Sequence, residues 1–199
     1  MAYEPNDFYA RKAKKENFVA RSIYKLEEID NKYHLFRRND FVLDLGASPG
    51  SWMQYASKKV GDGGKVFGID LKPIEIKLSN AIFVQGDINE LNFEMLFEKY
   101  SLDKKFNVVM SDMAPNTSSN RFTDQARSYD LSMMALGTAQ KFLLQGGNFV
   151  CKIFDGEDAM SFRDSVKECF KEVQIVRPKS TRDSSKEIFV VGKNFSAIQ

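Results

Sequence analysis

Residues 41–52, FVLDLGASPGSW, join a short apolar run to a turn that contains two glycines. The apolar run, 41–46, predicts a buried strand, and residues 51–60 have the pattern of a helix. Gly46 and Gly50 allow the backbone of the turn to approach a ligand closely. A strand, a glycine turn and a helix in this order predict part of an open α/β sheet, which binds ligands where its strands end.

The rest of the chain repeats this alternation. Further helices are predicted at 18–33, 91–100, 126–145 and 159–170, and further strands at 65–70, 81–87, 106–112, 148–154, 172–176 and 186–192. Such alternation predicts an α/β fold with a mostly parallel seven-stranded sheet and helices on both faces. The last two strands have no helix between them, so we expect one antiparallel edge strand. Residues 113–125 and 177–185 are predicted to be loops.

The composition suits a single domain spanning residues 1–199, because 43% of its 199 residues are hydrophobic. Residues 1–38 hold nine Lys or Arg and six Asp or Glu, and we expect them to form a basic N-terminal extension and helix. The single His34 and the two cysteines, Cys151 and Cys169, have no metal-ligand spacing, so we expect no metal site and two buried, reduced thiols.

No apolar run is long enough to predict a membrane-spanning helix, and the first residues lack the apolar core of a secretory signal. Glu4 and Asp7 also disfavour a transit peptide. We therefore expect an intracellular, cytoplasmic monomer that is not associated with a membrane. A mitochondrial or nucleolar location stays open.

Three predicted strands end in an acidic residue, namely Asp70, Asp87 and Asp112. Asp70 follows Gly50 by 20 residues, the spacing at which an acid reaches a ribose diol in nucleoside-binding sheets. The turn is G-x-x-x-G rather than the G-x-G-x-x-G of dinucleotide folds, which disfavours a nicotinamide-dependent oxidoreductase, and no P-loop follows. A nucleoside without a pyrophosphate fits better, and S-adenosylmethionine is the commonest such cofactor. Alternatively, the glycines only make the turn and the aspartates only cap loops.

Five stretches resemble the FtsJ/RrmJ family of ribosomal RNA ribose 2′-O-methyltransferases. They are RSIYKLEEID (21–30), VLDLGASPGSW (42–52), VVMSDMAPN (108–116), GGNFVCKIF (146–154) and SSKEIFVV (184–191). The resemblance covers nearly the whole chain and implies a Rossmann-like methyltransferase fold that uses S-adenosyl-L-methionine. Residues 71–86 depart from the bacterial pattern of the family.

The resemblance implies a catalytic tetrad of Lys25, Asp112, Lys152 and Glu187. It also implies a set of cofactor contacts: Gly46, Ala47, Pro49, Gly50, Ser51, Trp52, Asp70, Leu71, Asp87, Ile88 and Asp112. For Trp52, packing in the core is an equally good interpretation. Within the tetrad, Lys152 stands out, because an apolar strand rarely contains an unpaired lysine.

The tetrad suits methylation of a hydroxyl. A ribose hydroxyl is a weak acid, so a base must take its proton as the methyl group is transferred. The resemblance gives this role to Lys152. A second ammonium on Lys25, together with burial, would favour the neutral amine of Lys152, whereas Asp112 would oppose that effect while holding the amine in place. Glu187 would orient Lys25 or the incoming ribose.

Basic residues supply a candidate RNA surface, since cations bind phosphates without reading bases. They are Arg11, Lys12, Lys14, Lys15, Arg21, Arg37 and Arg38 near the start of the chain, with Arg177, Lys179 and Arg182 in the last loop. Phe8 and Tyr9 either stack on a base or pack on the domain. Residues 113–125 could order over the substrate or cofactor.

The resemblance implies large-subunit ribosomal RNA, or the large ribosomal subunit, as the partner, and a uridine in the loop that receives aminoacyl-tRNA as the target. Two alternatives stay open. One is methylation of tRNA or capped RNA, and the other is a non-catalytic ribosome assembly factor on the same fold.

Overall fold

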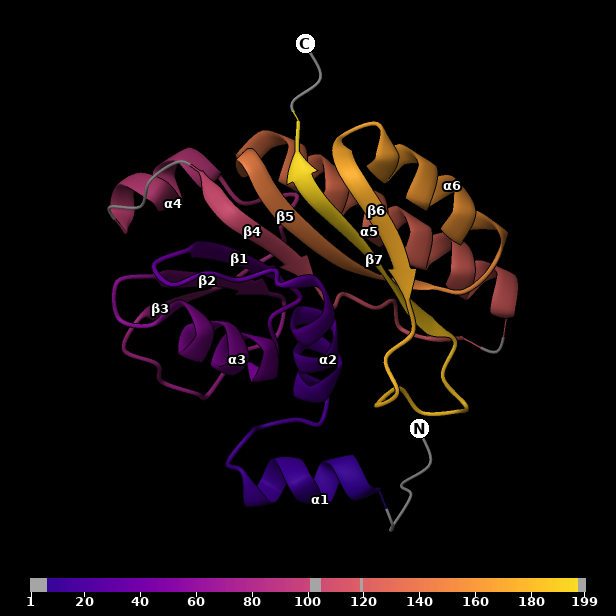
Figure 1. Ribbon diagram of the computed structural model, residues 1–199, viewed down its shortest axis with the longest axis horizontal. Coiled ribbons are helices and arrows are strands. Elements are labelled where there is room, and N and C mark those ends of the chain that lie inside the picture. Colours follow the sequence, from indigo (N-terminus) through magenta and orange to yellow (C-terminus); the bar gives the residue numbers. More distant parts are fainter. Residues whose placement is uncertain (1–6, 101–104, 119, 197–199) are drawn as a thin grey trace.

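The computed structural model describes residues 7–100, 105–118 and 120–196. Its centre is a seven-stranded sheet in the order β3-β2-β1-β4-β5-β7-β6 (Figure 1). The strands are β1 (Phe41–Leu45), β2 (Lys65–Asp70), β3 (Ala81–Gln85), β4 (Phe106–Ser111), β5 (Leu143–Phe154), β6 (Phe170–Val176) and β7 (Glu187–Phe195). The α/β class and the seven-stranded sheet are as the sequence predicts.

Strands β1 to β5 all run parallel to one another, and β7 runs antiparallel to both β5 and β6. The β6–β7 pair lies at one edge of the sheet, as expected. Within that pair the strand of reversed direction is β7, and the outermost strand is β6. Strand order reverses at β1, which lies between β2 and β4, so a crevice is expected at the carboxyl ends of these strands.

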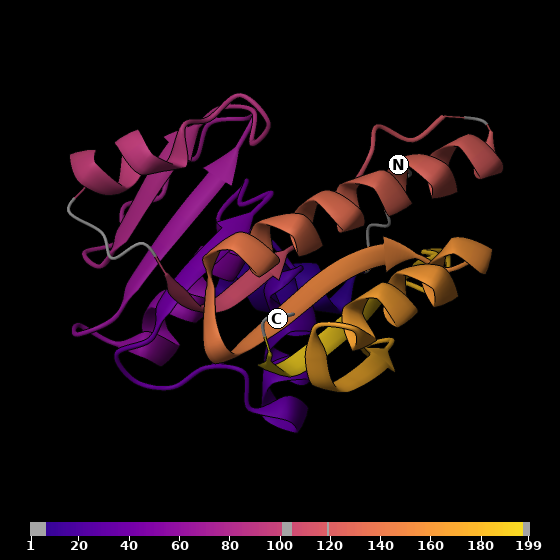
Figure 2. The same cartoon turned by 90° about the horizontal axis from the view of Figure 1, so that it is seen from above.

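Helices cover both faces of the sheet (Figures 1 and 2). One face carries α2 (Ile23–Tyr33) and α3 (Ser51–Val60), and α1 (Phe8–Lys15) packs outside α2. The other face carries α4 (Phe93–Lys99), α5 (Arg121–Phe142) and α6 (Glu157–Lys167). No helix in the described ranges is long and apolar enough to cross a membrane.

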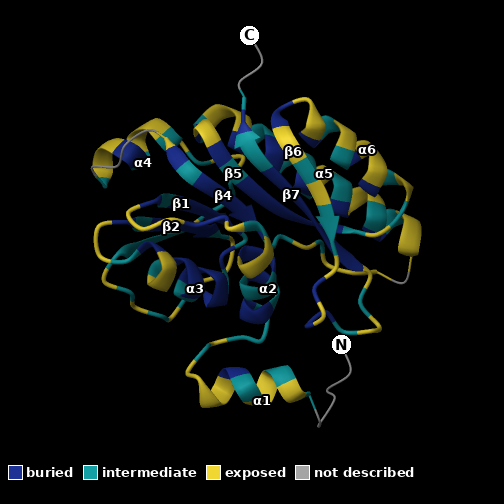
Figure 3. Cartoon of the chain, viewed as in Figure 1, coloured by how far each residue is buried: buried dark blue, intermediate teal, exposed yellow. Residues whose placement is uncertain are grey.

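The core has two halves because successive side chains of a strand point to opposite faces. Val42, Met110 and Val150 face α2 and α3, whereas Leu43 and Phe149 face the opposite helices. Buried residues accordingly concentrate along the sheet in Figure 3. Both cysteines are buried and free, as predicted, and burial raises the pKa of the Cys151 thiol to about 12.

Several boundaries differ from the predicted ones. Helix α1 was not predicted, because it is short and strongly polar, and only Ala13 of its eight residues is buried. The helix predicted at 18–33 begins at Ile23. Helix α5 begins inside the predicted loop 113–125, since the Asn120 side chain caps it by accepting from the Phe122 and Thr123 amides. The same helix ends at Phe142, because Leu143 pairs with Phe106 as the start of β5.

Candidate active site

The glycine turn lies between the end of β1 and the start of α3. The amides of Gly46 and Ala47 donate to the Ile69 carbonyl at 2.9 and 3.1 Å, which holds the turn against the end of β2. Gly46 has φ +79°, and a Cβ there would lie 2.7 Å from the Met113 side chain and 2.9 Å from its backbone nitrogen. Gly50 has φ +110° and would meet the Ile76 side chain. Both positions therefore require glycine.

Of the other turn residues, Pro49 is exposed and follows a cis peptide bond, whereas Ala47 and Ser51 are buried. The Ser51 hydroxyl forms a 2.7 Å hydrogen bond with that of Ser22, and this bond links the turn to α2.

Trp52 belongs to the core. Its side chain is only 2% exposed, its indole N–H donates to the Ser22 carbonyl at 3.0 Å, and its ring packs on Phe189. The structure therefore shows the core packing of Trp52, and its predicted cofactor contact stays a prediction.

The predicted strand-end acids organise the loops that follow β2 and β3. Asp70 accepts from the Ser48 amide at 2.9 Å and from the Lys72 amide at 2.8 Å. Asp87 accepts from the Asn89 amide at 2.9 Å. Each carboxylate oxygen can accept a further hydrogen bond, so these contacts are compatible with a ligand. Leu71 is 66% exposed beside Asp70, and Ile88 is half-buried against the core on the α4 face.

Lys152 and Asp112 form an ion pair at the carboxyl ends of β4 and β5. Ser111 is in register with Cys151, so the next residue of each parallel strand, Asp112 and Lys152, are neighbours. The Lys152 ammonium lies 2.9 Å from Asp112 Oδ1 and donates to the Asp112 carbonyl at 2.5 Å. The Lys152 side chain is 7% exposed and that of Asp112 is 19% exposed.

Lys25 and Glu187 form a second ion pair, and each side chain is 12% exposed. Lys25 is in the first turn of α2, and Glu187 is the first residue of β7. On β7, Glu187 lies two residues before Phe189, which is in register with Lys152 on β5. Glu187 and Phe189 therefore project from the same face, the face that α2 covers. The structure thus brings all four predicted tetrad residues together on one face of the sheet, near the carboxyl ends of β4 and β5.

Asp44 is a candidate that the sequence analysis missed. It is the fourth of the five residues of β1 and has an exposed fraction of 0%, and neither carboxylate oxygen has a hydrogen-bond partner in the described part of the chain. Burial, and secondarily the nearby charges of Asp112 and Asp70, hold the pKa of Asp44 well above its usual value. The signal was visible in FVLDLG, because an aspartate inside an apolar strand is as unusual as the lysine that was singled out.

Part of the predicted RNA surface is gathered around Asp7. The Asp7 carboxylate caps α1 and pairs with both Arg21 and Arg182, at 3.0 Å in the case of Arg182. Glu28 of α2 accepts from the amides of Lys179 and Ser180 at 2.7 and 2.9 Å. These contacts join α1, α2 and the β6–β7 loop, so their cations lie on one side of the molecule, below the sheet in Figure 1.

Two of the predicted basic residues lie elsewhere. Arg37 and Arg38 precede β1, at the amino ends of the parallel strands, and Arg38 lies beside Gly61. The carboxyl ends that carry the acids are at the opposite end of the sheet, so these two arginines do not join the α1 surface. Tyr9 packs on Tyr24 with ring centroids 5.5 Å apart, whereas Phe8 is 62% exposed.

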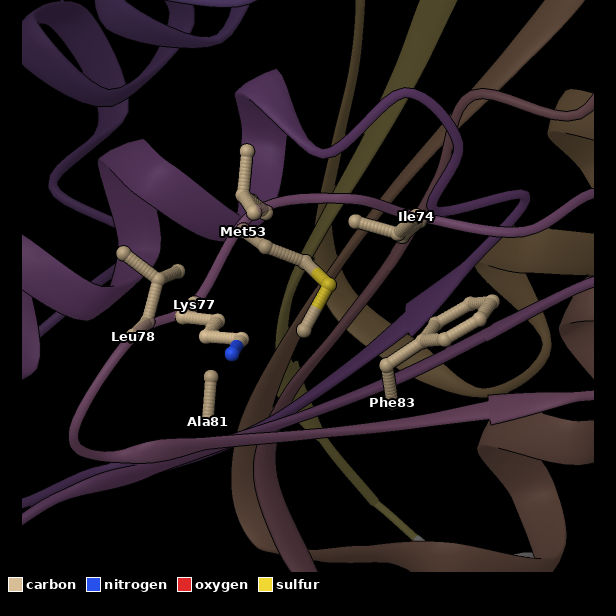
Figure 4. Close-up of a pocket in the computed structure, with 7 residues that line it drawn as sticks. Met53, Ile74, Lys77, Leu78, Ala81 and Phe83 are labelled. Atoms are coloured by element: carbon tan, nitrogen blue, oxygen red, sulfur yellow. The ribbon is translucent and has the colours of Figure 1, made fainter.

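A small cavity of about 190 Å³, lined by apolar side chains and Lys77, lies between α3, residues 74–78 and β3. Figure 4 shows Met53 and Phe83 at its lining, with Ile74 and Leu78 from the segment after β2. None of the strand-end acids lines this cavity, but its lining residues Ile74 and Ile76 lie against Gly50, so it adjoins the glycine turn.

Comparison with known proteins identifies the family. Residues 18–195 match the FtsJ-like methyltransferase family. "Ribosomal RNA large subunit methyltransferase E" of Bdellovibrio bacteriovorus is 54% identical over 192 residues, covering 96% of this chain and 98% of that protein. The protein of the same name from Desulfosudis oleivorans is 46% identical, covering 94% of this chain and 89% of the relative.

Solved structures agree with this result. A Plasmodium falciparum protein described as a ribosomal RNA methyltransferase has a TM-score of 0.78 and 30% identity, covering 91% of this chain and 100% of that one. The fibrillarin pre-rRNA processing protein of Methanococcus jannaschii shares the fold, with a TM-score of 0.55 and 18% identity over 80% of this chain and 68% of that one. The chain belongs to the FtsJ-like methyltransferase family.

Proposed function

We propose that this protein transfers a methyl group from S-adenosylmethionine to a ribose 2′-hydroxyl, that of a uridine in large-subunit ribosomal RNA. The observation that carries the proposal is the meeting of Lys25, Asp112, Lys152 and Glu187 as two ion pairs where β4, β5 and β7 approach α2. The names of the relatives from Bdellovibrio and Desulfosudis support ribosomal RNA as the acceptor.

The residues present fit the cofactor. Gly46 and Gly50 have positive φ, and the absence of a side chain at these positions lets the turn between β1 and α3 bring its backbone close to a ligand. Asp70, Asp87 and Asp112 supply acceptors at the ends of three strands of the same crevice. We assign them the polar contacts with the cofactor, and we assign the exposed Leu71 an apolar contact. When bound, S-adenosylmethionine supplies an electrophilic methyl group on a positively charged sulfur.

Lys152 is the base in this proposal. Its Nζ is held from two sides by the carboxylate and the carbonyl of Asp112, so its position is fixed before substrate arrives. In this role Lys152 acts as the neutral amine, which takes the proton of the hydroxyl and becomes an ammonium as the methyl group is transferred. Much of the rate enhancement over the uncatalysed reaction then comes from holding the hydroxyl in line with the methyl group.

Lys25 and Glu187 position the ribose. They form a pair on the side of the site that faces the β6–β7 loop, and that loop is joined to α1 through Asp7. The RNA backbone would bind to the cations of α1 and of the loop, which place a nucleotide without reading its base.

The acceptor is tested by supplying radiolabelled S-adenosylmethionine with one of four RNAs: large ribosomal subunits, naked large-subunit ribosomal RNA, tRNA or capped RNA. We expect label in ribosomal RNA or in the subunit. Preferential labelling of tRNA or capped RNA would redirect the substrate assignment. No labelling of any acceptor, with RNA binding intact, would favour a non-catalytic assembly factor.

A further inference from the structure

The mechanism above does not use Asp44, although this carboxyl group is the most deeply buried acid beside the proposed cofactor site. Asp44 is fully buried, and both of its oxygens lack a hydrogen-bond partner among the described residues. Its side chain faces α2 and α3, because it lies two residues after Val42, whose side chain packs on that side.

The neighbouring strands explain why Asp44 has no partner. Its register partner on β2 is Gly68, which has no side chain, and its register partner on β4 is Met110, which has no hydrogen-bond donor. Ala47 and Met53, which lie close to Gly68, are also apolar. A buried carboxylate in such surroundings would be neither solvated nor paired, and that arrangement is costly.

The charged groups around Asp44 disfavour its ionisation further. Asp70 at the end of β2 and Asp112 after β4 are both anions whose fields reach Asp44. On this face of the sheet, Lys152 of β5 is engaged by Asp112, and Lys25 of α2 is engaged by Glu187. The ligand-free site therefore combines three carboxyl groups on adjacent strands with two lysines that are each already paired with an acid, so no described cation compensates a charge on Asp44.

We propose that Asp44 carries a proton in the ligand-free enzyme and releases it to solvent when the positively charged cofactor binds. This inference rests on the proposed function, because it needs a cation to occupy the crevice between Asp70 and Asp112. The reaction is balanced: the neutral carboxyl becomes a carboxylate, one proton passes to the buffer, and the cofactor's positive charge compensates the new anion.

A consequence is that Asp44 helps the enzyme to distinguish its cofactor from its product. S-adenosylhomocysteine has lost the methyl group and with it the sulfonium charge, so it cannot favour the carboxylate in the same way. Proton release and affinity are linked, and a ligand that displaces a proton binds more tightly as the pH rises. The preference for S-adenosylmethionine over S-adenosylhomocysteine should therefore increase with pH.

The test is calorimetric titration of S-adenosylmethionine and S-adenosylhomocysteine into the enzyme, in buffers with different ionisation enthalpies, across about pH 5–9. For the wild type we expect release of up to about one proton more with the cofactor than with the product, and an affinity for the cofactor that rises by up to about tenfold per pH unit. Asp44→Asn should abolish both differences, because the amide cannot ionise.

Asp40→Asn is the matched control. Asp40 is also buried, has a pKa raised by burial, and lies at the opposite end of β1, where it accepts from the Arg37 amide at 2.7 Å. We expect this variant to release protons as the wild type does. Equal release by the wild type and Asp44→Asn, or equal release with the two ligands in the wild type, would overturn the inference. Failure of the cofactor to bind at any pH would overturn the proposed function as well.

A measurement on the wild type alone tests the inference even if the Asp44→Asn variant does not fold. Infrared difference spectra of enzyme labelled with carbon-13 at the aspartate side-chain carboxyl should lose the carbonyl band of a protonated carboxyl when S-adenosylmethionine is added. They should keep that band with S-adenosylhomocysteine. A band that is absent before addition, or that persists after it, contradicts the proposal.

Discussion

The two ion pairs of the candidate site differ in how the fold holds them. Lys152 and Asp112 lie side by side near the carboxyl ends of two adjacent parallel strands in the middle of the sheet, and the carbonyl of Asp112 accepts from the same ammonium. Lys25 and Glu187 come from α2 and from the start of β7, segments more than 150 residues apart in the chain. The first pair is therefore fixed by strand pairing, and the second depends on how a helix and a loop dock on the sheet.

This difference suggests a division of labour. A group that must abstract a proton needs a precise position, which the centre of a sheet provides. A group that positions a large RNA benefits from belonging to the elements that contact that RNA. Glu28 and Asp7 tie the β6–β7 loop to α2 and α1, so contacts made by RNA at the surface could be transmitted to Lys25 and Glu187.

The largest expected effect is on the first pair. Lys152→Ala removes the proposed base, and we expect the single-turnover rate of methyl transfer to fall by about 10²–10⁴-fold. Affinity for the cofactor should change little. The control is Lys167→Ala, which removes a half-exposed lysine that pairs with Asp164 on α6. A Lys152→Ala enzyme with an unchanged rate would rule out Lys152 as the base.

The second pair should show a smaller, coupled effect. Lys25→Ala and Glu187→Ala should each slow single-turnover methyl transfer by roughly 10–100-fold through loss of positioning. The double variant should lose less than the sum of the two in free energy, because either single change already breaks the pair. Fully additive losses would mean that the two residues act independently.

Glu28→Gln should weaken the function of the second ion pair and leave that of the first unchanged. The Glu28 carboxylate accepts hydrogen bonds from two loop amides. Weakening these hydrogen bonds should lower the free energy of unfolding by about 1–2 kcal/mol. We expect the KM for RNA to rise, while affinity for S-adenosylmethionine stays constant. Glu27→Gln removes the same charge one residue earlier on α2 and should leave the KM unchanged. A change in cofactor affinity alone would show that the loop serves the first pair instead.

The smallest effect concerns the outer surface. Lys14 and Lys15 are exposed at the end of α1. Replacing both with Ala should reduce the salt dependence of RNA binding by about one unit of slope per lost phosphate contact. Arg37→Ala with Arg38→Ala should leave the slope unchanged, because these arginines lie at the amino ends of the strands. The reverse result would place the RNA on the opposite end of the sheet.

The first pair was easier to predict than the second for a physical reason. Strand ends are visible in the sequence, so Asp112 and the lysine in the apolar strand could be placed at one edge of a sheet. Nothing local to Lys25 or Glu187 indicates their partnership, which was predicted only through the family resemblance. Helix α1 and its Asp7 contacts escaped prediction because they depend on tertiary ion pairs.

Position in the sequence does not by itself fix where a side chain lies in the fold. Arg37 and Arg38 belong to the same basic stretch as Lys14 and Lys15, yet the chain turns through α2 and carries them to the opposite end of the sheet. Trp52 directly follows the glycine turn, yet the start of α3 directs its ring toward Phe189 in the core. Sequence proximity to a site does not decide on which side of an element a side chain lies.

The most direct test of the account is to map ribose methylation on large-subunit ribosomal RNA at nucleotide resolution. The acceptors are naked RNA and isolated large subunits, each treated with wild-type protein, Lys152→Ala or Lys167→Ala. The account predicts one methylated ribose, at a uridine, that appears with the wild type and Lys167→Ala and is nearly absent with Lys152→Ala. Methylation of a base rather than a ribose, or equal ribose methylation by all three proteins, would contradict it.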